Sequence, residues 1–251
     1  MKWFFCIAFC GIVNIVFSQF ELPYSEGEYV SYKIYFGPIN VGFAELEVTD
    51  ALELNNKKTL HIIGKGRTAI FFDWFFKVRD IYETVIDTKT LLPVLFKRSV
   101  KEGGYSINQR YEFYHNKNKV VTQDSSFFIP VNTQDMLSAF FLARTFRKKD
   151  INKKEPFYIP IFMDNENYNL EIKYLGDQIV RTKWGNVKCM VFQPKMQEGR
   201  VFQDGEQMKI WITDDKNHLL LRVETKIWAG KITAVLQAYK ELKNEISIIR
   251  E

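Results

Sequence analysis

Most of this 251-residue sequence alternates apolar and polar side chains with a period of two, in segments that short polar turns separate. In residues 29–36, for example, Val30, Tyr32, Ile34 and Phe36 fall on one face. Alternation of this kind indicates a half-buried β-strand. Because the connecting segments are too short for a crossover helix, we expect neighbouring strands to pair in antiparallel fashion.

The same pattern recurs along most of the chain. We predict further strands at 41–49, 59–66, 77–86, 91–100, 105–114, 157–163, 168–174, 178–183 and 187–193, and a meander over 208–239. Turns such as Gly37-Pro38 fit between strands, because proline presets φ and glycine tolerates unusual backbone angles. The last segment, 241–251, is predicted to be a short helix or a frayed tail.

One segment departs from the alternation. Over residues 132–146, apolar side chains recur at spacings of three and four, which predicts an amphipathic helix. Asn132 or Thr133 is expected to cap its first turn, and Asp135 complements the positive end of the helix.

About fourteen strands and one helix predict an all-β protein. So many strands rarely lie flat, because the twist of each strand makes a long sheet curl, close or split. We therefore expect a large, strongly curved antiparallel meander sheet or an open β-barrel, with the helix at about 132–146 packed on its concave face.

Two stretches of the chain resemble each other in their order of strands and turns. Asp87 aligns with Asp215, and Leu91-Leu92 aligns with Leu219-Leu220. Any two meanders share turn chemistry, so common turns explain the likeness as well as an old duplication does. We predict one domain over 19–251, made of two related halves at about 19–147 and 155–251.

The first residues have the order of a secretory signal peptide. A basic start is followed by an apolar run from Trp3 to Phe17, which is shorter than a membrane-spanning helix requires. We predict a signal peptide at 1–18 with cleavage at Ser18-Gln19; the alternative is an uncleaved anchor. Cys6 and Cys10 each follow a phenylalanine, which argues against a lipoprotein.

The mature chain would then have 233 residues, a net charge of +4 and a single cysteine, Cys189. A single cysteine closes no internal disulfide, so the apolar core must supply the stability. The charge is too small to argue for nucleic acid. No other apolar stretch approaches spanning length, so we expect no membrane span in the mature chain.

The sequence shows no recognisable catalytic or metal-binding pattern. His61, His115 and His218 lie far apart and form no paired metal motif, so no metal or cofactor is expected. Cys189 lies within a predicted strand with no histidine near it in sequence, and we expect a buried thiol.

Two carboxylates, Asp80 and Glu83, could supply an acid and a base. We expect ion pairs with Lys77 or Arg79 instead.

An aromatic cluster stands where a polar turn is expected, between the strands predicted at 59–66 and 77–86. Its rings are Phe71, Phe72, Trp74, Phe75 and Phe76. One interpretation is a loop that plugs the concave core of the sheet; the other is a surface for an apolar ligand or partner. We predict these five residues, together with Phe140 of the helix, as candidate ligand contacts.

A basic run follows the predicted helix, at Arg144, Arg147, Lys148, Lys149, Lys153 and Lys154. It is interpreted as a solvated helix end, with contact to an anionic lipid or glycan as the alternative.

Several motifs resemble a known family. They are Tyr35-Phe36-Gly37-Pro38-Ile39 with Gly42-Phe43-Ala44, Val78 to Glu83 with Asp87, Gln134 to Phe140, and Trp211 to Asp215. Together they resemble the domain of unknown function 3108 family, over nearly the whole mature chain. The resemblance implies a mostly β, periplasmic protein of Gram-negative bacteria with no established activity, and it supplies no catalytic residue. In outline, the curled sheet with a helix is also similar to carriers that escort lipoproteins across the periplasm, by analogy of fold alone.

The leading hypothesis is a non-enzymatic protein of the periplasm or outer membrane. It would bind an apolar or amphipathic small molecule, or an envelope protein, in the concavity of the sheet, with the helix as gate or floor. One alternative is an envelope interaction scaffold that acts through strand edges or the basic run. Another is a hydrolase of envelope polymers, which would need two carboxylates in one cleft.

Overall fold

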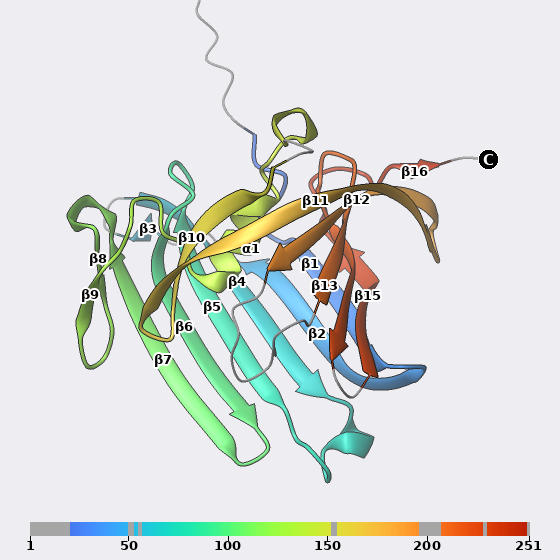
Figure 1. Cartoon of the computed structure of the whole chain (residues 1–251), viewed down its shortest axis with the longest axis horizontal. Coiled ribbons are helices and arrows are strands. Elements are labelled where there is room, and N and C mark those ends of the chain that lie inside the picture. Colours follow the sequence, from blue (N-terminus) through green and yellow to red (C-terminus); the bar gives the residue numbers. More distant parts are fainter. Residues whose placement is uncertain are drawn as a thin grey trace, which may run out of the picture.

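The computed structural model describes residues 21–49, 53–54, 57–151, 155–195, 207–227 and 230–249. The predicted signal peptide at 1–18 and its cleavage site lie outside these residues. Strands and their turns make up most of what is described, and one α-helix interrupts them (Figure 1).

Along the sequence, the described strands fall into two groups, one before and one after the helix α1 (Met136–Ala143). The first group is β1 (Tyr29–Phe36), β2 (Ile39–Thr49), β3 (Glu53–Leu54), β4 (Lys57–Thr68), β5 (Arg79–Asp87), β6 (Pro93–Glu102), β7 (Tyr105–Tyr114), β8 (Lys119–Val121) and β9 (Ser126–Phe128). The second is β10 (Phe157–Met163), β11 (Glu166–Thr182), β12 (Gly185–Lys195), β13 (Gln207–Thr213), β14 (Leu220–Ile227), β15 (Gly230–Lys240) and β16 (Ile248–Ile249). Three 3₁₀ turns are also described, η1 (Ile70–Phe72), η2 (His115–Lys117) and η3 (Lys148–Asp150).

The strands form one meander that starts in the middle of the sequence. Its order is β10-β11-β12-β13-β14-β15-β1-β2-β4-β5-β6-β7-β8-β9, and every neighbouring pair is antiparallel. The first strand therefore pairs with the last long strand, through partners such as Tyr32 and Leu236. Within the described residues the sheet is not closed by strand pairing, because β9 and β10 end the path.

The sheet curls until its two ends approach each other. The ring of Phe162 in β10 lies 5.2 Å from that of Tyr111 and 5.4 Å from that of Phe127, between centroids. The Asn167 side chain donates a hydrogen bond to the Phe128 carbonyl at 2.8 Å. The prediction of a strongly curved antiparallel meander with a helix on its concave face is confirmed.

Helix α1 is shorter than the predicted 132–146, and a different residue caps it. The backbone of Gln134 pairs with β10, where it donates to Pro160 O and accepts from Phe162 N, so the helix cannot include it. Asp135 is the N-cap and accepts hydrogen bonds from the amides of Leu137 and Ser138, both at 2.8 Å. Ser138 Oγ accepts from the Asp135 amide, which completes a capping box. The expected caps at Asn132 and Thr133 are wrong.

Three strand predictions also need correction. The segments 168–174 and 178–183 belong to one 17-residue strand, β11, which bends at a bulge near Gly176 where φ is +121°. The short strands β8 and β9 were not predicted. The C-terminal segment is neither a helix nor free throughout, since β16 pairs with β12.

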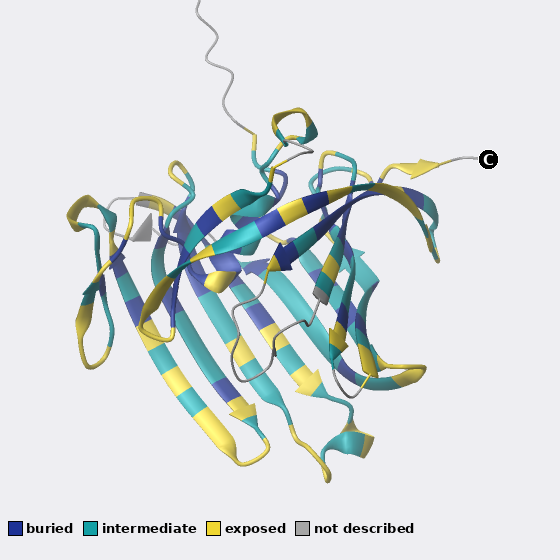
Figure 2. Ribbon diagram, in the orientation of Figure 1, coloured by how far each residue is buried: buried dark blue, intermediate teal, exposed yellow. Residues whose placement is uncertain are grey.

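Two apolar clusters share strand β12. On one face of β12, Met190 and Phe192 join the larger core, which also holds Phe141 of α1. On the other face, Val187, Cys189 and Val191 join a second core with Trp211 and Leu236. Burial is concentrated at the end of the sheet that α1 covers, and it decreases toward the opposite end of β5, β6 and β7 (Figure 2).

Candidate functional site

The aromatic loop, residues 69–78 between β4 and β5, projects from the end of the sheet opposite α1 (Figure 1). Phe71, Trp74 and Phe75 are 75, 80 and 77 % exposed, and Ile70 is 82 % exposed. Of the two interpretations of this loop, the one in which it plugs the concave core is therefore wrong. Phe72 is half-buried and Phe76 is 49 % exposed.

A polar clamp at the base of the loop holds the rings outward. Asp73 accepts two hydrogen bonds from the Arg79 guanidinium, at 3.0 and 2.5 Å, and one from the Thr68 hydroxyl at 2.6 Å. Thr68 Oγ1 in turn accepts from the Val78 amide at 3.1 Å. These contacts tie the start of the loop to its end, so its fold does not depend on burying the rings.

The clamp also corrects the part of the ion-pair prediction that concerns Arg79. Arg79 pairs with Asp73 rather than with Asp80 or Glu83, while Glu83 pairs with His61 at 3.1 Å. The hydrogen bond from Arg79 is the largest cause that holds the pKa of Asp73 below its ordinary value. The carboxylate therefore keeps its charge, and the clamp persists at neutral pH.

The turn between β6 and β7 supports the loop from one side. Gly103 has φ of +59°, and a Cβ built there would lie 2.9 Å from Cε2 of Phe76. The Gly103 amide donates to Lys77 O at 2.9 Å. A glycine is required at this position both for its backbone conformation and for the close approach of the ring.

Phe140, the sixth predicted ligand contact, lies away from the loop. It lines a cavity of about 40 Å³ between α1 and strands β10 to β13, with other lining residues such as Phe146, Met190 and His218. Small-molecule sites measure roughly 300–1,000 Å³, so this cavity is too small for a lipid. The structure brings together the five predicted residues of the loop and separates Phe140 from them.

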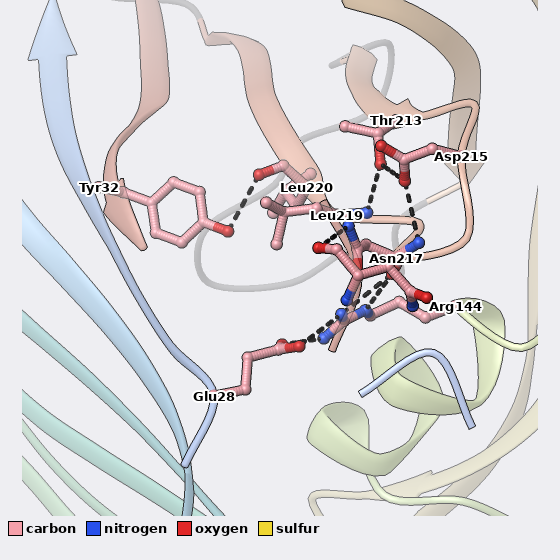
Figure 3. Close-up of polar contacts among 9 residues, drawn as sticks. Glu28, Tyr32, Arg144, Thr213, Asp215, Asn217, Leu219 and Leu220 are labelled. Carbon is pink, nitrogen blue, oxygen red and sulfur yellow. Dashed lines mark hydrogen bonds and ion pairs between the residues drawn. The ribbon is translucent and has the colours of Figure 1, made fainter. Parts of the chain in front are cut away.

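A second polar cluster lies beside α1, and sequence reasoning missed it (Figure 3). Arg144, which follows α1, donates to both carboxylate oxygens of Glu28, at 2.5 and 3.0 Å, and its guanidinium also donates to Asn217 O. Both charged side chains are 2 % exposed. Asp215 accepts from the Asn217 amide and the Thr213 hydroxyl, which fixes the β13–β14 turn. In the sequence, the basic run draws attention to Arg144, but it does not identify Glu28 as the partner of this arginine.

The basic run is a solvated helix end only in part, since Arg147 and Lys149 are exposed. Arg144 is buried in its ion pair, and Arg147 pairs with Asp150 at 2.6 Å. Lys148 pairs with Asp177 and Asp214 at 2.6 and 2.7 Å. Residues 153 and 154 lie outside the described part of the chain. Acidic partners thus neutralise three of the cations in this run.

The remaining candidate groups have structural partners. His115 contacts the Pro93 carbonyl and His218 the Arg144 carbonyl, and among the described residues no group of three His, Cys, Asp or Glu could hold a metal ion. Cys189 is buried, as expected, and desolvation raises its pKa to about 12. Such a thiol stays protonated and unreactive at neutral pH.

No helix in the described residues is long and apolar enough to cross a membrane.

Three solved structures are similar to this chain, and the likeness to the first of them bears on its fold. A β-barrel-like protein of the domain of unknown function DUF1849 from Brucella abortus has a TM-score of 0.54 and 10 % identity, with 85 % of this chain and 96 % of that chain covered. A candidate exported protein with a YmcC-like fold from Bacteroides fragilis has a TM-score of 0.39 and 10 % identity, over 88 % and 98 % of the two chains. A candidate lipoprotein from Parabacteroides distasonis has a TM-score of 0.40 and 9 % identity, over 87 % and 97 %.

At these identities the likeness to the Brucella protein shows the fold alone, and the other two scores carry no further weight. No curated protein matches the sequence. The family described as "Protein of unknown function (DUF3108)" matches residues 31–237. That match spans most of the chain, from β1 to β15, and agrees with the motifs identified in the sequence. The chain therefore belongs to the DUF3108 family, whose function is not established.

Proposed function

We propose that this chain is a non-enzymatic exported protein that binds an apolar or amphipathic partner through its aromatic loop. The observation that carries this proposal is the exposure of Ile70, Phe71, Trp74 and Phe75 on a loop that an internal clamp keeps ordered. Exposed apolar clusters of this kind mark interaction sites on soluble proteins. A loop already folded loses little conformational entropy on binding, which favours affinity.

Export is supported by the signal peptide predicted at 1–18 and by what the family resemblance implies. A non-enzymatic role is supported by the use of the buried charged groups. Asp135 caps α1, and Glu28 neutralises Arg144, so both are committed to structure. The cavity beside Phe140 measures only about 40 Å³, and for this reason we place binding on the loop.

A titration of the mature chain with the zwitterionic detergent dodecylphosphocholine tests the proposal. We expect the backbone amides of residues 70–76 and the Trp74 indole to shift first in NMR spectra. The double variant Trp74→Ser/Phe75→Ser should lose these shifts. Phe128→Ser is the matched control, because Phe128 is 70 % exposed but lies on β9. Shifts that centre on α1 and spare the loop would refute binding at the loop.

A further inference from the structure

Several turns meet at the same end of the sheet as the aromatic loop (Figure 1). Because β1, β2, β4, β5, β6 and β7 are successive antiparallel neighbours, the β1–β2 turn, the aromatic loop and the β6–β7 turn lie along one edge. Exposed apolar side chains continue along this edge at Phe36, Ile39 and Tyr105. We call the loop and these two turns, with the adjoining ends of β14 and β15, the rim.

The rim also carries the net charge of the protein. Its described segments 33–40, 67–79, 101–105, 226–227 and 230–231 contain seven Lys or Arg and two Asp or Glu, a net charge of +5. The mature chain has a net charge of +4, so the rest of it has a net charge of −1. One of the two acids, Asp73, is neutralised within the clamp by Arg79. Positive charge and exposed rings therefore coincide on one edge.

The rings and cations of the rim are arranged in the same order as the apolar interface and the charged headgroups of a lipid surface. The rings lie at the projecting turns, and Arg67, Lys77 and Lys101 stand one to a few residues behind them. Tryptophan prefers the interface between headgroups and acyl chains, and phenylalanine is common on the apolar faces of helices that enter it. Apolar side chains of peripheral proteins enter this interface by roughly 5–10 Å, which leaves cations behind them at the headgroups. Because the turns follow one edge, a planar surface could contact several of them together.

This inference rests on the proposed function and names the partner at the same site: we infer that the rim binds the surface of an anionic phospholipid bilayer. The loop rings enter the interface, and the lysines and arginines behind them contact phosphate groups. The strands then stand at a steep angle to the surface, with the α1 end of the sheet away from it.

Sedimentation with vesicles tests the inference. The mature chain is mixed with vesicles of phosphatidylcholine and phosphatidylglycerol at a ratio of about 7:3, or of phosphatidylcholine alone, at low and high salt. We expect binding to the anionic vesicles that is at least about tenfold tighter than to the neutral ones, and that weakens as salt screens the charges. Trp74→Ser/Phe75→Ser should abolish binding to both.

A second pair of variants tests how much the rim cations contribute to vesicle binding. Lys77→Gln/Lys101→Gln removes two exposed rim cations and should weaken binding to anionic vesicles by about 30-fold, with little effect on neutral ones. Lys89→Gln/Lys216→Gln removes two exposed lysines outside the rim and should leave binding unchanged. Phe128→Ser serves the same purpose for the rings.

The outcomes separate this inference from the proposed function. If the loop binds detergent but the chain does not bind anionic vesicles, the bilayer inference falls and an amphipathic small molecule or a protein becomes the partner. Vesicle binding that survives Trp74→Ser/Phe75→Ser would also overturn it. If neither detergent nor vesicles affect residues 70–76, both the inference and the proposed function fail.

Discussion

The two ends of this sheet handle charge and apolar surface in opposite ways. Beside α1, an arginine and a glutamate are buried to 2 % exposure, and at the rim three aromatic side chains are 75–80 % exposed. Burying apolar area stabilises a fold by about 25 cal/mol per Å². The exposed rings of the rim bury little apolar area, so they contribute little to the stability of the fold. They are available for contact with a partner.

The two ends also achieve order differently. The α1 end is held by packing, for example by the edge-to-face contact of Tyr24 with Phe141 at 4.9 Å. The aromatic loop is held by the hydrogen bonds among Thr68, Asp73 and Arg79. A loop fixed by polar contacts can display apolar side chains, whereas a loop fixed by packing must bury them. The comparison leads to four predictions, in order of decreasing effect on stability.

The largest contrast is expected between two phenylalanines. Phe141→Ala empties a site that is 1 % exposed, and it should lower the free energy of unfolding by about 3–5 kcal/mol. Phe75→Ala, at 77 % exposure, should change it by less than about 0.5 kcal/mol. Urea denaturation followed by circular dichroism measures both. A loss of several kcal/mol in Phe75→Ala would show that the rim is part of the folding core.

The buried ion pair should rank next. Glu28→Ala leaves the Arg144 guanidinium buried without its counter-ion. This change should lower the free energy of unfolding by up to about 3–5 kcal/mol. The control is Arg147→Ala, because the Arg147–Asp150 pair is at least half exposed and should be worth at most about 1 kcal/mol. Equal effects in both variants would contradict the structural role assigned to the buried pair.

Most of the fold could be predicted from the sequence, because alternation is a local property of each strand. Residues 105–114 and 157–163 were predicted with the bounds that the structure has. The bulge near Gly176 was predicted as a break, since a glycine among polar residues also ends strands. The N-cap of the helix was predicted too early in the sequence, because the backbone of Gln134 pairs with β10 instead of joining the helix. No local pattern predicts this contact.

The candidate site was predicted in composition but not in orientation. The aromatic cluster is evident in the sequence, but no local pattern predicts that its rings are exposed or that Arg79 pairs with Asp73 at the base of the loop. The charge of the rim includes Lys226 and Lys231, which join the edge through the pairing of β15 with β1. Contacts between residues so distant in sequence have no local signal. The relation of the two predicted halves stays a prediction.

The pH dependence of stability should distinguish the buried carboxylate of the α1 cap. Burial raises the pKa of Asp135 from 3.8 to about 6, so the folded state keeps a proton over a range in which the unfolded state has released it. This contribution is fully present below pH 4 and is lost as pH rises through 6, by up to about 3 kcal/mol. Asp135→Asn keeps a cap oxygen but does not titrate. The difference in unfolding free energy between wild type and this variant should therefore decline from pH 4 to pH 6; a flat difference would contradict it.

The smallest effect on global stability is expected at the clamp. Asp73→Asn removes the charge that Arg79 contacts and should leave the unfolding midpoint almost unchanged, while the amides of Phe75 and Phe76 exchange hydrogen faster. The sign of the pH effect follows from the lowered pKa of Asp73: the clamp persists above the ordinary value of 3.8 and weakens only as pH falls through the lowered one. Hydrogen exchange measured by mass spectrometry on both proteins tests this, with the amide of Leu137 in α1 as the internal reference. If the loop amides of Asp73→Asn stay as protected as in wild type, packing holds the loop, and the contrast between the two ends is lost.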